Sequence, residues 1–556
     1  MASSCSNLLT VPDSPQALGL EHEFWRPYQK ESIEQILAAF QYTDRVMVDA
    51  PTGAGKTVTG AAIARMLGGN AAYMAHTIYL QLQQLRTLPS AVTVTGRRNH
   101  PCINEMGKML GMTADDADCP CQLACPEEDG GCPYYAQWFR ALDSRDVVLN
   151  YAFVVRILKA RGIKVAEGYG DGPKQNILAN PFQGRSLMVC DEGHNLEAAL
   201  LDADGVEIHQ RSFERHGIRL PSSLDVESWF EWAPDALLDV RESYRDRIAG
   251  RGTARTREHV QEDSQVRSLV RALDATTELT KSKEHTPIYV GRTEYGYRIR
   301  PLWAWNRSHN ILFRHAPKTI ILSATMGEPV LAAKLLGLEN WEHVKVPSTF
   351  PVKNRPVFYW PVSRMKYNMS EEDKVKQGVA LIHLARKFPD SPGVVHCNSF
   401  ALGKYLMDVV ERYDPDIRSR MFTHTSITRE KAFAYFENDP GNEILVTPSA
   451  TTGVDWDFVG WQMIPKVPFP DLSDEFVRLR CDYIAEDGDT IGKKVYAQEA
   501  VKTLVQAAGR CVRTPSSRGV TIVTDSAFWP LFKYTAAAAF PEWFRQAVTW
   551  YNPSPA

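Results

Sequence analysis

The feature that most constrains the fold is a strand–loop–helix pattern at residues 45–67, RVMVDAPTGAGKTVTGAAIARML. Arg45–Asp49 is rich in strand-forming apolar residues, a loop with two glycines follows, and Lys56–Leu67 carries apolar residues at helical spacing. Loop amides and the positive end of the helix can hold phosphate oxygens, while Lys56 neutralises their charge and the Thr57 hydroxyl can ligate Mg²⁺. The pattern therefore predicts a nucleotide phosphate site.

Two acidic residues follow a second apolar strand pattern, RSLMVCDEGHN at residues 185–195. At the carboxyl edge of a parallel sheet, Asp191 can hold Mg²⁺ through water and Glu192 can polarise the water that attacks a γ-phosphate. An acidic pair after a strand is by itself more often part of a solvated loop. Together with the loop at Lys56, however, the pair favours an ATP hydrolysis site.

Two further segments extend this pattern. Residues 321–326, ILSATM, predict an apolar strand that runs into small hydroxyl residues. In QAAGRCVR, the side chains of Gln506, Arg510 and Arg513 are four and three positions apart, which predicts that they share one face of a helix. Arginines from a second domain can stabilise the γ-phosphate charge, so that hydrolysis depends on domain closure.

These segments together resemble the motifs of the XPD/DinG-like iron–sulfur helicases, a family of superfamily 2 DNA helicases. APTGAGKT resembles motif I, DEGH motif II, LSATM motif III, TTGVDWDFVG motif V and QAAGRCVR motif VI, in the family's order. Lesser similarities extend the resemblance to nearly the whole chain, in WRPYQKESIEQIL, MAHTIYLQLQQL, VVLNYAF, PSTFP and VVHCNSF.

The chain departs from the family pattern at a few positions. Ala50 stands where the general phosphate-loop pattern has glycine, and Gly193 replaces the alanine of DEAH. We expect Gly193 to be tolerated, because both acids and His194 are retained. Ser517 stands where the family has aspartate and Ala527 where it has arginine, which bears on coupling between the ATP and DNA sites rather than on ATP binding.

The resemblance implies an α/β fold with two RecA-like P-loop motor domains, the first interrupted by an iron–sulfur cluster domain and a mainly helical arch domain. The implied boundaries are 1–95, 146–200 and 301–345 for the first motor domain, 96–145 for the cluster domain, 201–300 for the arch domain and 346–556 for the second motor domain. Helical spacing of apolar residues in DALLDVRESYRDRI supports helices in the arch segment.

The resemblance also assigns site residues. The implied catalytic residues are Lys56, Asp191, Glu192, Gln506, Arg510 and Arg513. The implied ATP-binding residues are Arg26, Gln29, Ala50, Pro51, Thr52, Gly53, Ala54, Gly55, Lys56, Thr57, Gly453 and Asp455. Thr57 and Asp191 are the expected Mg²⁺ ligands.

Five cysteines lie close together in the sequence, at Cys102, Cys119, Cys121, Cys125 and Cys132. In a reducing compartment such a cluster indicates a metal or redox site rather than disulfides. By resemblance, a [4Fe-4S] cluster takes Cys102, Cys125, Cys132 and one more thiolate, with Cys119 and Cys121 both open as the fourth. Zinc is the alternative metal, although its structural sites favour paired short knuckles and Cys102 stands alone.

Aromatic and cationic side chains lie near these cysteines in the sequence. They are Tyr134, Tyr135, Trp138, Phe139, Arg97, Arg98 and Arg140. Such a mixture suits base stacking and backbone contacts where strands separate. Packing around the cluster is the alternative, above all for Tyr135 and Trp138.

The charge balance gives no global attraction to nucleic acid, since 63 basic and 66 acidic residues leave a formal net charge of −3. A local groove is therefore expected to hold such a partner. The chain begins without a secretory-type leader and contains no long apolar run, so we expect a cytoplasmic protein without a membrane partner.

By resemblance, the expected function is an ATP-dependent DNA helicase that acts in repair or replication. It would translocate on single-stranded and forked DNA, 5′ to 3′, as a monomeric motor. Alternatives are an ATP-gated nucleic-acid-binding protein without strand separation, and an RNA-directed motor.

Overall fold

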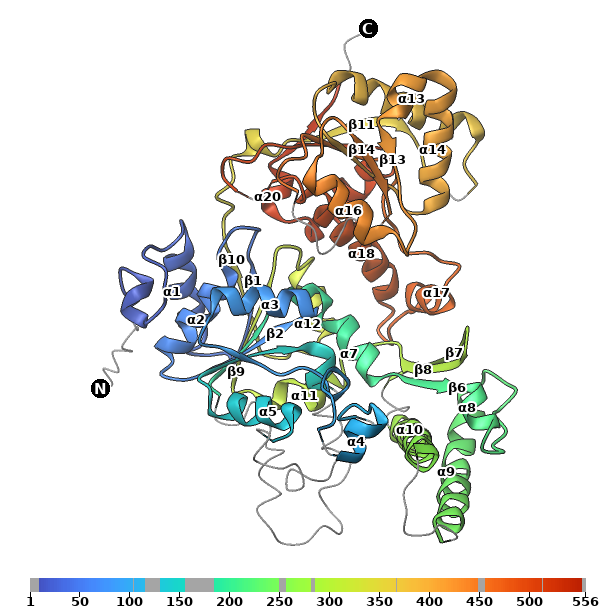
Figure 1. Ribbon diagram of the computed structural model, residues 1–556. Coiled ribbons are helices and arrows are strands. Elements are labelled where there is room, and N and C mark those ends of the chain that lie inside the picture. Colours follow the sequence, from blue (N-terminus) through green and yellow to red (C-terminus); the bar gives the residue numbers. More distant parts are fainter. Residues whose placement is uncertain are drawn as a thin grey trace.

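The structure is a computed structural model (Figure 1). It describes residues 10–103, 105–115, 131–155, 185–249, 257–281, 286–366, 368–448, 456–512 and 514–552. Two seven-stranded sheets and one three-stranded sheet organise these residues. We call the first seven-stranded sheet and its helices the first body, and the other seven-stranded sheet and its helices the second body.

The sheet of the first body is parallel throughout. Its strands lie in the order β10 (Glu342–Lys345), β1 (Arg45–Asp49), β9 (Lys318–Ser323), β5 (Leu187–Cys190), β2 (Ala71–Ala75), β4 (Asp146–Asn150) and β3 (Val92–Thr93). Its helices are α1 (Gln29–Ala39), α2 (Lys56–Met66), α3 (Ile78–Thr87), α4 (Glu105–Leu110), α5 (Pro133–Asp143), α7 (Leu196–Asp204), α11 (Ser308–Ile311) and α12 (Pro329–Leu335). The expected strand at 45–49 and helix from Lys56 are therefore confirmed.

Both faces of this sheet are covered by apolar clusters. Successive strand residues point to opposite faces, so neighbouring residues of one strand enter different clusters. Val46 and Val48 of β1 belong to an apolar cluster with α1 and α2. Met47, between them, belongs to the cluster on the other face with α5, α7 and α12. This double burial explains why β1 is a nearly continuous apolar run.

The sheet of the second body is also parallel throughout. Its order is β13 (Met421–Phe422), β14 (Ile444–Thr447), β12 (Gly393–His396), β15 (Trp461–Ile464), β16 (Val520–Asp525), β11 (Val357–Ser363) and β17 (Val548–Trp550). Its helices are α13 (Glu371–Lys387), α14 (Phe400–Tyr413), α15 (Pro415–Ser419), α16 (Arg429–Asn438), α17 (Glu475–Asp482), α18 (Ile491–Ala508), α19 (Phe528–Pro530) and α20 (Glu542–Arg545). Two such parallel α/β sheets fit two RecA-like domains.

The segment between α7 and α11 is mainly helical, as expected, but it also contains a small sheet. Two long helices, α9 (Val226–Ala249) and α10 (Arg257–Thr280), agree with the expectation and pack on each other. However, β6 (Val206–His209), β8 (Gly296–Pro301) and β7 (Ile288–Thr293) also form an antiparallel sheet. The helical pattern gave no sign of this sheet, which closes an apolar core around Trp229.

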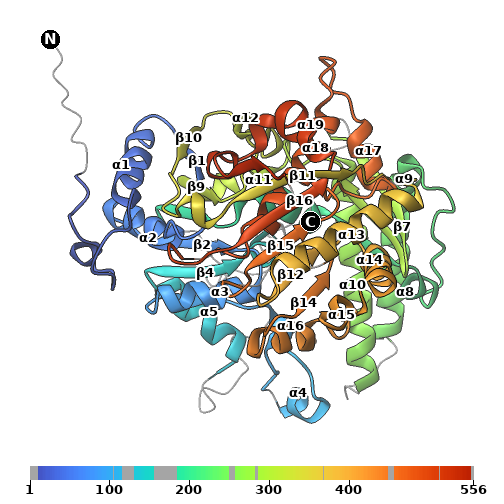
Figure 2. The same cartoon turned by 90° about the horizontal axis from the view of Figure 1, so that it is seen from above.

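Helix α17 and the start of α18 connect the two bodies. Phe476, Ile491 and Val495 belong to an apolar cluster of the first body, and Arg480 pairs with Glu197 of α7 at 2.7 Å. Figures 1 and 2 place α1 and the α9–α10 pair at opposite ends of the molecule. None of the described helices is both long and apolar enough to cross a membrane.

Candidate functional site

The loop between β1 and α2 is held by backbone geometry and by two side chains. Gly53 and Gly55 have φ angles of 82° and 78°, a region that favours glycine. Arg26 donates to the Gly53 carbonyl at 2.6 Å, and Gln29 donates to the Gly55 carbonyl at 3.1 Å. Helix α2 begins at Lys56, so its N-terminus lies directly after this loop, as expected.

Arg26 and Gln29 thus contact the loop backbone in this structure. Gln29 is buried and also donates to the Thr59 hydroxyl at 3.2 Å. Their direct binding of ATP stays a prediction. Thr57 lies in the first turn of α2 and is partly exposed, and its hydroxyl is an oxygen donor of the kind that Mg²⁺ takes.

The two acids meet Lys56 at the carboxyl end of β5. Lys56 Nζ lies 3.1 Å from Glu192 Oε1 and 3.9 Å from Asp191 Oδ1. Glu192 adopts a left-handed backbone with φ 49°, and its amide donates to Asp191 Oδ1 at 2.9 Å. The structure therefore places the cation and the two carboxylates close together, as the sequence pattern predicted.

The two carboxyl groups differ in electrostatic environment. Burial raises the pKa of Asp191 above its usual value, against the opposing charge of Lys56. Burial acts in the same direction on Glu192, but Lys56, His194 and Arg510 outweigh it and lower the pKa of Glu192 to about 2. Glu192 is therefore a charged carboxylate at neutral pH and can accept a hydrogen bond from water.

Gln84 of α3 is a site residue that the sequence interpretation missed. Its buried side-chain amide donates to Asp191 Oδ2 at 3.0 Å. Tyr151 donates from its hydroxyl to the Asp191 carbonyl at 2.8 Å. The sequence carried no local signal for Gln84, since its burial and its need for a partner become visible only in the fold.

His194 links the acids to the second body. Its Nδ1 lies 2.8 Å from Ser323 Oγ and 3.3 Å from Glu192 Oε2. Gln506 of α18 places its side-chain nitrogen 2.5 Å from His194 Nε2 and 3.4 Å from Thr325 Oγ1. An amide nitrogen donates, so Nε2 accepts and Nδ1 carries the proton. Burial lowers the pKa of His194 to about 4, which keeps this ring neutral.

The prediction that Gln506 and Arg510 share one helix face was wrong, whereas the part that concerns Arg513 stays a prediction. Helix α18 ends at Ala508, where the Gly509 amide closes the last turn on the Val505 carbonyl. Arg510 follows in a turn, close enough to Glu192 to lower its pKa. The helical spacing failed because the helix ends before Arg510 is reached. Arg513, Gly453 and Asp455 lie outside the described residues.

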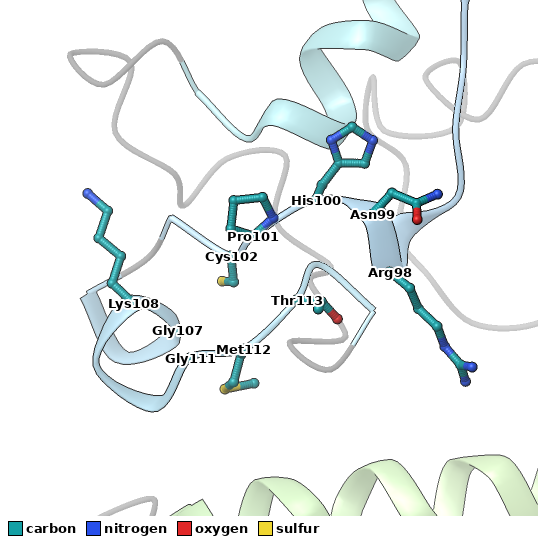
Figure 3. A pocket seen from close by; sticks show the side chains of 10 residues that line it. All are labelled: Arg98, Asn99, His100, Pro101, Cys102, Gly107, Lys108, Gly111, Met112 and Thr113. Carbon is teal, nitrogen blue, oxygen red and sulfur yellow. The ribbon is translucent and has the colours of Figure 1, made fainter. Parts of the chain in front are cut away.

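Two of the five clustered cysteines are described, and both are buried. Cys102 lines a cavity of about 390 Å³ together with Arg98, His100, Lys108 and neighbouring residues (Figure 3). Cys132 precedes the first turn of α5. Cys119, Cys121 and Cys125 lie outside the described residues, and among those described no three His, Cys, Asp or Glu side chains group to hold a metal. Of the two described thiols only Cys102 lines the cavity, and a thiolate there is a donor that suits a soft metal without deciding which one.

Most of the aromatic residues near the cysteines are packed inside the first body. Tyr134, Tyr135 and Trp138 are buried, and Tyr134 contacts both others edge-on. Arg97 lies over the Tyr134 ring at 5.5 Å. Phe139, at 42% exposure, remains on the surface. These three rings are therefore packed in the apolar core of the first body, and their packing around a metal cluster stays a prediction.

The comparisons with known proteins agree with this geometry. The family described as Helicase C-terminal domain matches residues 382–547, and the family described as Type III restriction enzyme, res subunit, matches residues 23–215. Among curated proteins, the ATP-dependent DNA helicase YoaA of Escherichia coli (strain K12) is 24% identical over 194 residues. That match covers 34% of this chain and only 30% of YoaA.

Two solved structures share the fold over most of this chain. An XPD helicase superposes with a TM-score of 0.59 at 13% identity, covering 95% of this chain and 99% of its own. Xpd4 of S. tokodaii gives a TM-score of 0.57 at 13% identity, covering 95% and 100%.

The family-model, sequence and fold matches together show a chain that is similar to helicases of superfamily 2 with two RecA-like domains. The resemblance noted in the sequence is thereby confirmed: within superfamily 2, the chain is XPD/DinG-like.

Proposed function

We propose that this protein is an ATP-dependent DNA helicase that hydrolyses ATP between its two bodies and translocates on single-stranded DNA. The contact between Gln506 and His194 carries this proposal. It joins the second body to the histidine that adjoins Glu192, and Glu192 in turn contacts Lys56. A phosphate site at a boundary between two α/β bodies is the arrangement that lets hydrolysis and domain movement drive each other.

The roles follow from position and charge. Lys56 and the loop amides take the β- and γ-phosphates, Thr57 and Asp191 hold Mg²⁺, and Glu192 orients the attacking water. Arg510 and Arg513 stabilise the charge that develops on the γ-phosphate. The other proposed ATP contacts are Arg26, Gln29, residues 50–55, Gly453 and Asp455.

A DNA path along the carboxyl edges of the two sheets is part of the proposal. Thr77 caps α3 just after β2, and Ile78, Tyr79 and Leu82 of that helix are exposed. Phe400, which begins α14 after β12, is also exposed. Apolar and aromatic side chains of this kind can stack on bases without reading their sequence. The name of YoaA favours DNA over RNA, and polarity from 5′ to 3′ follows the sequence resemblance.

The cysteine segment is proposed to hold a [4Fe-4S] cluster. Cys102 and Cys132 supply two thiolates, Cys125 a third, and either Cys119 or Cys121 the fourth. When bound, the cluster would supply structural cohesion to a segment with little apolar surface of its own. The boundaries 96–145 for a cluster domain and 201–300 for an arch domain belong to the same proposal.

Lys56→Ala tests the proposed function. The variant should lose ATP hydrolysis stimulated by single-stranded DNA, because phosphate charge is left without its cation. Lys30→Ala is the matched control, since Lys30 pairs with the exposed Asp13 at 2.7 Å on the surface of α1. DNA-stimulated hydrolysis that survives in Lys56→Ala contradicts the assignment.

The substrate is tested with the wild-type protein. Forked duplexes with 5′ or 3′ single-stranded tails, in DNA and in RNA of the same sequence, should show unwinding only from a 5′ DNA tail. Stimulation by RNA equal to that by DNA would favour the RNA-directed motor. Binding without unwinding would favour the ATP-gated binding protein.

A further inference from the structure

Trp543 of α20, in the second body, contacts the first body beside the proposed nucleotide site. Its indole Nε1 donates to the carbonyl of Ala324 at 3.4 Å. Ala324 stands between Ser323, which contacts His194, and Thr325, which contacts Gln506. A hydrogen bond from the second body therefore holds the backbone between the residue that contacts His194 and the residue that contacts Gln506.

The same indole also lies beside the turn that carries Arg510. A Cβ added at Gly509 would lie 4.0 Å from the Trp543 ring atom Cη2, so the ring lies beside this turn. Trp543 and Gly509 line a small cavity of about 20 Å³ together with Pro51 and Thr52 of the phosphate loop. Trp543 is thus next to the phosphate loop, the strand end after β9 and the end of α18.

Arg355 ties Trp543 to a second contact with the phosphate loop. The Arg355 guanidinium donates to the carbonyls of Phe350 (3.1 Å) and Trp543, and it lies over the Trp543 ring at 5.7 Å. Phe350 packs so closely on Gly53 that a Cβ there would lie 2.6 Å from its Cζ. Arg355 is buried, and two of its guanidinium nitrogens, Nε and Nη1, donate to the carbonyls of Phe350 and Trp543.

We propose that Trp543 is a positioning residue for ATP hydrolysis. It holds the Ala324 carbonyl and the Gly509 turn at a fixed separation, so that Arg510 reaches the phosphate site when the two bodies close. The inference rests on the proposed function for the reaction that it serves. Binding of ATP by the phosphate loop does not need Trp543, whereas stabilisation of the transition state by Arg510 does.

Trp543→Phe in the full-length protein separates the hydrogen bond from the packing, because phenylalanine keeps a ring but has no N–H. We expect the kcat for DNA-stimulated ATP hydrolysis to fall about tenfold while KM for ATP changes less than twofold, as for loss of an interaction made in the transition state. Trp543→Ala should fall further, since it loses the ring as well. Trp550→Phe is the matched control: Trp550 packs on Tyr359 and Trp529 within the second body.

Hydrogen exchange at residues 322–328, with and without a slowly hydrolysed ATP analogue, gives a readout independent of turnover. The analogue should protect this segment in the wild type and in Trp550→Phe, but much less in Trp543→Phe. Equal protection and equal kcat in Trp543→Phe and the wild type overturn the inference while the helicase assignment stands. A wild type that is protected but hydrolyses no ATP overturns the proposed function and leaves the positioning contact supported.

Discussion

Gly193 lies against the side chain of Ile321 so closely that a Cβ at position 193 would be 2.3 Å from Ile321 Cγ2. Ile321 is on β9 and is fully buried, so its branched side chain has no free direction in which to move. The space that an alanine methyl would need after the two acids is therefore filled from the neighbouring strand. Glycine at position 193 is therefore required by the size of the isoleucine at position 321.

Gly193→Ala should therefore destabilise this protein, although it restores the family's DEAH sequence. We expect a loss of about 1–3 kcal/mol in the free energy of unfolding, as for other overpacked sites, and a fall in ATP hydrolysis because His194 is displaced. Urea unfolding and ATPase assays on the same samples measure both effects.

Ile321→Ala removes Cγ2 and serves as the second arm of a double-mutant cycle. Alanine at 193 should cost less in the Ile321→Ala background than in the wild type, because the two residues are in contact. Equal costs in both backgrounds would show that the contact does not limit the position.

Glu192→Gln should abolish hydrolysis while ATP still binds. The amide has no negative charge to polarise water, and loss of such a group typically costs about 10²–10⁴-fold in rate. Single-turnover hydrolysis and binding of a fluorescent ATP analogue separate the two effects. Glu214→Gln, at an exposed position of helix α8 (Gln210–Glu214), is the control. A rate within tenfold of the wild type would remove Glu192 from the proposed mechanism.

The sequence was most informative where chemistry and local geometry coincide. The run from Arg45 through Lys56 predicted a strand, a loop and a helix, and β1 and α2 have these bounds to within a residue. The left-handed glycines of the loop and the buried strand restrict the backbone conformation of this segment locally. The acids Asp191 and Glu192 were placed correctly because they end a central strand of the same sheet.

Contacts between segments distant in the sequence were not predictable in the same way. The hydrogen bond from Gln84 to Asp191 joins residues 107 positions apart, and that from Trp543 to Ala324 joins residues 219 apart. Neither has a local pattern. The position of Arg510 was misjudged for a different reason: spacing along a presumed helix took no account of the stop at Gly509.

His396 makes the stability of the protein depend on pH. Its Nε2 shares a hydrogen bond with Gln462 Oε1 at 2.9 Å, while Nδ1 has no partner among the described residues. Burial lowers the pKa of His396 from 6.5 to about 4. Between these values the unfolded chain binds the extra proton, so the free energy of unfolding falls as the pH drops from 6.5 towards 4.

The expected contribution of this ring is on the order of 3 kcal/mol over that interval. Urea unfolding at several pH values should therefore show a shallower pH dependence for His396→Gln than for the wild type. His309→Asn, at an exposed position, should keep the wild-type slope. A slope unchanged by His396→Gln would mean that the ring is not the group that titrates.

Removal of individual cysteines tests the metal and its ligands. Protein purified without oxygen should contain iron and absorb visible light, and Cys102→Ser or Cys132→Ser should lose both, because a cubane cluster needs one thiolate for each iron. Of Cys119→Ser and Cys121→Ser, one should retain the iron and the other lose it, which identifies the fourth ligand. Cys481→Ser is the control, since Cys481 lies on α17, a helix of the second body. Zinc in place of iron in the wild type would instead assign a tetrahedral thiolate site, and the same four substitutions would then report its ligands.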